Sequence, residues 1–150
     1  MTRALALLFC LSAMSLTARA QSSDADAAIR ATALDYIEGW YTADAARMER
    51  ALHPELAKRI VFSNAQGQSR LDSMGAMTLV QRVRAGGGTR TPKEKQQKDV
   101  TILDRYENTA MVKVVAADWV DYLQIAKFNG EWKIINVLWE LKPAEKAPAR

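Results

Sequence analysis

The stretch V-D-Y-L-Q-I-A-K-F-N-G-E-W-K-I-I-N-V-L-W, residues 120–139, carries the strongest local signal for structure in the chain. Asn129-Gly130 lies between two apolar runs, and both residue types tolerate the positive φ angles of a type I′ turn. The pattern predicts an antiparallel hairpin with strands at 120–128 and 131–140. A two-residue turn also fixes the register, which would pair Ile125 with Ile134 and Asp121 with Leu138.

Alternation along these strands divides the side chains between two faces of the hairpin. A carboxylate on an inner face is costly unless it is hydrogen-bonded or wetted by a pocket, so Asp121 is a candidate site residue. The alternative is a structural role at the sheet rim, bonded to a backbone amide or an arginine. The predicted inner face has the denser apolar set and comprises Asp121, Leu123, Ile125, Trp132, Ile134, Asn136 and Leu138.

The other face of the predicted hairpin has a large apolar patch with few charges. Exposed patches of this kind mark interfaces more often than chance would give. We therefore predict a homodimer through this outer face, with four interface candidates: Tyr122, Ile135, Val137 and Trp139.

The rest of the chain predicts helices first and strands last. Apolar residues recur at three- and four-residue spacing over 24–40, as on one face of a helix. Pro54 would end a second helix at 43–52, with one more helical turn at 55–58. Short strands at 59–63 and 69–71, a third helix at 73–85 capped by Asp72-Ser73, and strands at 100–105 and 110–117 complete the pattern. The expected fold class is α+β, with three helices packed on one face of a curved antiparallel sheet.

The two ends of the chain differ in composition from the middle. Arg3, an uncharged apolar run at 4–16 and the small residues of Ala18-Arg19-Ala20 predict a signal peptide cleaved after residue 20. A retained membrane anchor is the alternative. We expect an exported, periplasmic or extracellular protein with one domain at 24–142, no membrane association after cleavage, and a disordered Pro/Ala-rich tail at 143–150. Cys10 would leave with the signal peptide.

Charge and motifs exclude several classes of function. Without Arg3 and Arg19 of the predicted signal peptide, the 21 basic residues fall to 19 against 17 acidic ones, and a net charge of +2 is too small to indicate a nucleic acid or an anionic membrane as partner. One histidine, no cysteine after cleavage and no dinucleotide or P-loop fingerprint give no support for a metal or another cofactor. Six basic residues surround the loop Gly86-Gly87-Gly88, and a solvated loop is favoured there over a phosphate-binding one: Arg82, Arg84, Arg90, Lys93, Lys95 and Lys98.

Four separated segments are similar to a known family. They are D-Y-I-E-G-W-Y at 35–41, D-A-A-R-M-E-R-A-L-H-P-E-L-A-K-R at 44–59, V-D-Y-L at 120–123 and N-G-E-W-K-I-I-N-V-L-W at 129–139. Over about residues 26–141 the chain resembles the putative lumazine-binding family of the nuclear transport factor 2-like (SnoaL-like) superfamily. The resemblance implies a cone of three helices against a bent antiparallel sheet, with a pocket between them. The superfamily includes ketosteroid isomerase and many non-catalytic binding modules, so a reaction does not follow.

Within such a cone, the resemblance makes several residues pocket candidates. His53 at the end of the second helix would lie near the pocket mouth as a general base, or pack beneath the first strand. Tyr36 and Trp40 face inward from the first helix, and a buried phenol needs a hydrogen-bonding partner. Lys58 is expected in a surface salt bridge, with Asp121 or an anionic ligand as alternative partners. The candidate ligand-binding residues are Tyr36, Trp40, His53, Asp121, Trp132 and Asn136.

The favoured function is an exported small-molecule-binding or accessory domain for a small hydrophobic or aromatic molecule. One alternative is a small isomerase, dehydratase or cyclase that uses Asp121, His53 and Tyr36. Such an enzyme needs a carboxylate base and a proton donor that converge on one apolar cavity. The other alternative is a dimeric protein-interaction module with a vestigial pocket.

Overall fold

The structure is a computed structural model that describes the backbone of residues 4–143 and the side chains of residues 23–143. Most of the tail predicted at 143–150 lies outside the described residues. The helices are α1 (Ala4–Thr42), α2 (Ala45–Ala51), α3 (Ala76–Arg84) and the short 3₁₀ helix η1 (Lys93–Lys95). The strands are β1 (Leu52–Ser63), β2 (Ser69–Gly75), β3 (Lys98–Tyr106), β4 (Thr109–Ala116), β5 (Trp119–Phe128) and β6 (Glu131–Leu141).

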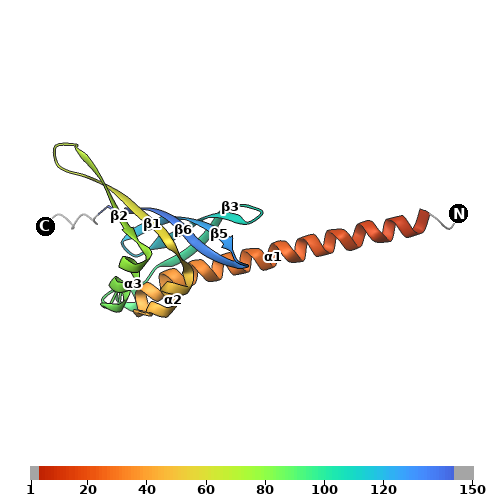
Figure 1. Cartoon of the computed structure of the whole chain (residues 1–150), viewed down its shortest axis with the longest axis horizontal. Helices are drawn as coiled ribbons and strands as arrows, with labels where there is room; N and C mark the ends of the chain where they lie inside the picture. Colours follow the sequence, from red (N-terminus) through yellow and green to blue (C-terminus); the bar gives the residue numbers. More distant parts are fainter. Residues whose placement is uncertain (1–3, 144–150) are drawn as a thin grey trace.

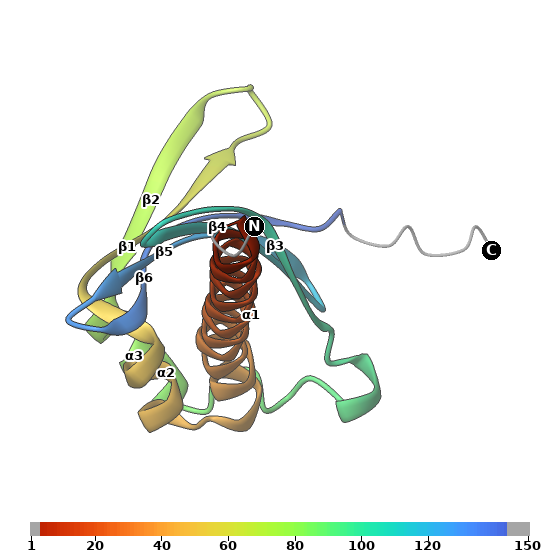
Figure 2. The same cartoon turned by 90° about the vertical axis from the view of Figure 1, so that its right-hand side faces the viewer.

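The strands form one curved sheet in the order β2-β1-β6-β5-β4-β3. All neighbouring strands are antiparallel except β1 and β6, which run parallel. The end view shows α1 lying in the hollow of the sheet, with α2 and α3 below the β1 side (Figure 2). The β1–β2 hairpin and the N-terminal part of α1 project away from this body (Figure 1). The predicted α+β class and the helices on one sheet face are confirmed.

The core lies between α1 and the hollow face of the sheet. Ile29, Ala33 and Ile37 follow the predicted helical spacing and are completely buried against the sheet. On the strands, Val112 and Leu123 alternate inward in the same way and are also completely buried. Each fully buried aliphatic side chain of this size stabilises the fold by about 1.5–3 kcal/mol. No described helix is long and apolar enough to cross a membrane.

The segment after α2 differs from the prediction. Asp44 caps α2 by accepting a hydrogen bond from the backbone N–H of Arg47, but the helix ends at Ala51 and β1 begins directly. The expected helical turn at 55–58 is therefore wrong. Pro54 is tolerated inside β1 because the pairing of β1 with β6 is interrupted between Leu52 and Ala57, so no ladder hydrogen bond is lost there. Strand β2 likewise runs to Gly75, and α3 begins three residues later than predicted.

The β5–β6 hairpin has the predicted turn but not the predicted register throughout. Ile125 pairs with Ile134 as expected, whereas Gln124 pairs with Asn136, so Ile135 is an extra residue in β6. This β-bulge reverses the faces of the remaining β6 residues.

The bulge corrects four face assignments. Val137 is 2% exposed and packs in the core, and Trp139 is partly buried against it, so neither lies on the outer face as predicted. Leu138 is 56% exposed, and Asn136 shares the outer face with Gln124. Asp121 therefore pairs with Trp139 rather than with Leu138.

Candidate functional site

A cavity of about 280 Å³ opens at one end of the sheet, between the three helices and strands β1, β2, β5 and β6. Its wall is largely aromatic and aliphatic, which is typical of sites for small molecules. The polar groups in the wall are few. The lining residues are Tyr36, Trp40, Met48, Lys58, Met74, Leu79, Arg82, Asp118, Trp119, Trp139 and Leu141. We call this space the inner cavity.

A buried polar cluster lies at the wall of the inner cavity. The ammonium group of Lys58 donates to the Asp121 carboxylate and, at 2.7 Å, to the Tyr36 hydroxyl. The Tyr36 hydroxyl in turn donates to Asp121 Oδ2 at 3.1 Å. Asp121 has no exposed surface and Lys58 is 5% exposed. Three elements, α1, β1 and β5, therefore meet through one ion pair and one phenol.

The carboxylate of Asp121 has a third donor. The indole N–H of Trp119 lies 2.6 Å from Asp121 Oδ2, two residues earlier in the same strand. Because a buried charge is tolerated only when it is paired and hydrogen-bonded, this set of three donors accounts for the inward position of Asp121.

Burial sets the protonation of the other two members of the cluster. Burial, followed by the negative charge of Asp121, raises the pKa of Tyr36 well above its ordinary value. Tyr36 therefore remains a hydrogen-bond donor at neutral pH. Burial lowers the pKa of Lys58 below its ordinary value, although the neighbouring Asp121 acts in the opposite direction.

Lys58 is the N–H donor of the buried cluster that lines the inner cavity. Lys58 has three N–H groups and only two oxygen acceptors, and its nitrogen lies 4.6 Å from the ring centroid of Trp139. The indole N–H of Trp139 is buried and has no hydrogen-bond partner among the described residues.

The aromatic wall is held by contacts between side chains from different elements. Trp40 on α1 meets Trp119 on β5 edge to face, with ring centroids 5.9 Å apart. The hydroxyl of Tyr41 donates to the carbonyl of Gln97 at 3.0 Å and accepts from the N–H of Ala117 at 2.8 Å, which ties α1 to the start of β5. These contacts fix the positions of the rings without a ligand.

Of the predicted pocket residues, Tyr36 and Trp40 line the inner cavity, and Asp121 bonds directly to its wall. His53 does not lie there. It stands at the start of β1, five residues before Lys58, which corresponds to roughly 16 Å of strand. Its ring packs against Phe128 at 4.5 Å, and its Nδ1 accepts from the N–H of Glu55. Of the two positions predicted for His53, the structure therefore has the packed one and not the one at the pocket mouth, because β1 starts earlier than expected.

The remaining two pocket candidates also lie elsewhere. Trp132 is 8% exposed in the core, where its backbone carbonyl accepts from the Thr32 hydroxyl of α1. Asn136 lies on the outer sheet face because of the bulge, and its amide donates to Gln124 at 2.9 Å.

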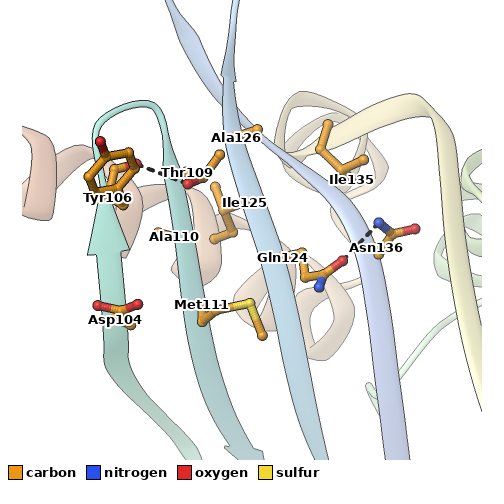
Figure 3. Close-up of a pocket in the computed structure, with 10 residues that line it drawn as sticks. All are labelled: Asp104, Tyr106, Thr109, Ala110, Met111, Gln124, Ile125, Ala126, Ile135 and Asn136. Atoms are coloured by element: carbon orange, nitrogen blue, oxygen red, sulfur yellow. Dashed lines mark hydrogen bonds between the residues drawn. The ribbon is translucent and has the colours of Figure 1, made fainter.

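The outer face has a hollow of its own, of about 370 Å³, in which Asn136 and Gln124 face each other across β5 and β6 (Figure 3). Asp104, Tyr106 and Met111 border the same hollow from β3 and β4. This hollow contains no buried ion pair like that of Lys58 and Asp121, so we place the candidate site at the inner cavity.

Two members of the site were not among the candidate residues from the sequence. A surface salt bridge was favoured for Lys58, with Asp121 as an alternative partner, and the structure has the alternative: Lys58 shares the inward face of β1 with Leu56 and Ile60, and all three are buried. That apolar alternation was present in the sequence but was interpreted as a helical turn. No sequence pattern indicated Trp119 as a site residue, because its role is to donate a hydrogen bond to the neighbouring Asp121. Among the described residues, no three His, Cys, Asp or Glu side chains lie together as a metal site would require.

The chain was compared with known proteins. No curated protein sequence matches it significantly. Three solved structures of nuclear transport factor 2-like proteins share its fold. The protein from Silicibacter pomeroyi is 16% identical, with a TM-score of 0.62 over 81% of this chain and 98% of that one. The protein from Shewanella baltica is 15% identical, with a TM-score of 0.60 over 81% of this chain and 97% of that one. The protein from Novosphingobium aromaticivorans, which has a cystatin-like fold, is 11% identical, with a TM-score of 0.62 over 89% and 92%.

These identities are low, so the three structures establish the fold alone, and they confirm the nuclear transport factor 2-like architecture. The model of one sequence family, described as putative lumazine-binding, matches residues 24–140. The match spans most of the described residues, and with it the chain is shown to belong to the putative lumazine-binding family.

Proposed function

We propose that the protein is an exported binding domain that holds a small apolar or aromatic molecule in the inner cavity. Support comes from the wall, where three tryptophans, Trp40, Trp119 and Trp139, surround a space the size of a compact organic molecule. The observation that carries the proposal is the ammonium group of Lys58, which lines this aromatic space and has only two oxygen acceptors among the described residues for its three N–H groups. Its third N–H would bind one acceptor atom of an otherwise apolar ligand.

Binding is favoured over catalysis of the isomerase type by the state of Asp121. A general base must have a free lone pair within reach of the substrate, whereas Asp121 accepts from Lys58, Tyr36 and Trp119 and has no exposed surface. The second group proposed for an enzyme, His53, lies at the far end of β1. The two therefore do not form a catalytic pair.

A matched pair of substitutions tests the proposed site. Met74 lines the inner cavity and is half-buried, so Met74→Trp would fill the space, whereas Met77 is 57% exposed on α3 and lies outside it. The probe is N-phenyl-1-naphthylamine, an uncharged bicyclic aromatic amine that fluoresces in apolar surroundings. We expect saturable binding to the wild type and to Met77→Trp, and binding weaker by at least about tenfold for Met74→Trp.

Equal binding of the probe by both variants would contradict the proposed site, provided that thermal unfolding shows Met74→Trp to be folded. The absence of binding to the wild type would contradict it as well.

The predicted homodimer remains part of the proposal, on a corrected surface. Tyr122 is 43% exposed and Leu138 56% exposed, and they pair with each other across β5 and β6 beside Met111. A second copy of the chain would cover this patch.

The proposal of export rests on residues 1–20 alone. Cleavage after Ala20 is tested by N-terminal sequencing of the protein from its own host.

A further inference from the structure

A second, larger space adjoins the inner cavity. It has a volume of about 900 Å³ and lies between the loop that follows α3, the start of β5 and the end of β6. Four residues line both spaces, namely Trp40, Asp118, Trp119 and Leu141. We call this second space the outer groove. The shared lining means that one molecule could lie along both.

The loop beside the outer groove is held tightly to α1. The N–H of Gly88 donates to the carbonyl of Trp40 at 2.8 Å. A Cβ atom on Gly88 would lie 2.4 Å from the indole nitrogen of Trp40, so only glycine permits this approach. The same loop is closed by the hydrogen bond of the Gln96 side chain to the carbonyl of Thr91. The loop therefore has a defined position next to the aromatic wall.

The structure separates the basic cluster of the sequence into two groups. Lys98 forms an ion pair with Glu38, and Arg84 forms one with Glu49, so these two cations connect elements of the fold. By contrast, Arg90 and Lys95 line the outer groove, and no described acidic side chain pairs with either of them.

The outer groove also receives Lys142, which donates to Gln97, a neutral partner. Arg82 is at the wall of the inner cavity and forms no ion pair with any described residue. One acid, Asp118, lies at the junction. Positive charge thus exceeds negative charge around the opening, whereas the interior is aromatic.

We propose that the inner cavity and the outer groove together bind an amphipathic anion. Its aromatic or apolar part would lie among the tryptophans, and its acidic group, a carboxylate or a sulfonate-like group, would lie beside Arg90 and Lys95. This inference rests on the proposed function and adds the chemical class of the ligand. Arg90 supplies a planar fork that matches an oxyanion, and the exposed position of both cations keeps their desolvation cost low.

Two probes that differ by one acidic group test the inference. They are N-phenyl-1-naphthylamine and 8-anilinonaphthalene-1-sulfonate, which share the anilinonaphthalene rings, while only the second carries a negative charge. Each is titrated into the wild type and into the double variant Arg90→Gln/Lys95→Gln, with fluorescence as the readout. The control Arg70→Gln/Lys127→Gln removes the same two charges at exposed positions on β2 and β5, away from both spaces.

For the double variant we expect the dissociation constant of the sulfonate probe to rise about fivefold, because the two exposed ion pairs together are worth about 1 kcal/mol. The binding of the neutral probe should not change. The control variant should bind both probes as the wild type does, and raising the salt concentration should weaken binding of the sulfonate probe alone.

Three outcomes would overturn the inference. If the control variant lowers the affinity for the sulfonate probe as much as the test variant does, the effect comes from the net charge of the protein and not from this groove. If both probes bind the double variant as they bind the wild type, the outer groove does not bind the acidic group, although the proposed function stands. If neither probe binds the wild type, the proposed function fails together with the inference.

Discussion

The buried ion pair of Lys58 and Asp121 is the residue-scale feature on which the site depends. We expect Lys58→Met to lower the free energy of unfolding by about 3–5 kcal/mol, because it leaves the Asp121 carboxylate buried without its counter-charge. Urea unfolding followed by tryptophan fluorescence measures this. The control is Lys127→Met at an exposed position, which should change stability by less than about 0.5 kcal/mol.

The double variant Lys58→Met/Asp121→Asn tests the cause of that loss. The amide removes the charge but keeps an oxygen that can accept from Tyr36 and Trp119, so most of the stability should return. A double variant no more stable than Lys58→Met would show that the ammonium acts through packing and not through charge.

From the sequence, Asp121 was predicted as a candidate site residue, whereas its pairing with Lys58 was only the alternative to a surface salt bridge. Asp121 was identified because alternation from Asn129-Gly130 placed a carboxylate among inward apolar residues, and no bulge intervenes in β5. The surface position was favoured for Lys58 because the apolar spacing around Pro54 suits a helical turn as well as a strand. The unpaired N–H of Trp139 could not be anticipated at all, since the extra residue that turns Trp139 inward leaves no mark in the local sequence.

At the scale of elements, the contact between the loop after α3 and helix α1 depends on Gly87 and Gly88, which both lie against Trp40. Gly88→Ala should lower the free energy of unfolding by about 1–3 kcal/mol, because its Cβ would overlap the Trp40 indole. Thermal unfolding measures the change. Gly75→Ala is the matched control, since a Cβ there would meet only an ordinary contact at 3.7 Å. If the two variants were equally stable, the close approach of the loop to Trp40 would be refuted.

The ion pairs of Glu38 join α1 to α2 and β3, and they predict a pH dependence. Hydrogen bonds from Lys98 and Arg47 lower the pKa of Glu38 below its ordinary value of 4.5. Because the folded pKa is the lower one, the unfolded chain binds more protons in acid, so this stabilisation is present above pH 4.5 and is lost as the pH falls through the folded value.

The variant Glu38→Gln should therefore be less stable than the wild type at neutral pH, and the difference should shrink below pH 4.5. Chemical unfolding at a series of pH values checks this, with the exposed Glu55→Gln as the control. A difference that is constant across the whole pH range would contradict a role for the charge of Glu38.

Among the elements, the late hairpins were predicted best, because two-residue turns with a strong sequence signature set both strands at once. The early strands were predicted too short. Strand β2 is exposed along almost its whole length and therefore shows no alternation between buried and exposed residues, so only its pairing with β1 defines it. The parallel contact between β1 and β6 joins segments about 80 residues apart, which no local pattern could reveal.

At the scale of the whole molecule, the outer sheet face predicts an assembly. We expect a dimer in solution, and Leu138→Glu should give monomers at concentrations where the wild type is dimeric, because a carboxylate would be buried in the contact. Light scattering coupled to gel filtration measures the mass. The control is Leu71→Glu, an equally exposed leucine on β2. If Leu138→Glu still formed dimers, the outer sheet face would be excluded as the dimer interface.

Whether the inner cavity binds an aromatic molecule is shown most directly by the position of such a molecule in a crystal. The measurement is an X-ray structure of the protein with N-phenyl-1-naphthylamine. We expect electron density for the ring system between Trp40, Trp119 and Trp139. Electron density for the probe only on the outer sheet face, over Tyr122 and Leu138, with the inner cavity closed by its own side chains, would contradict it.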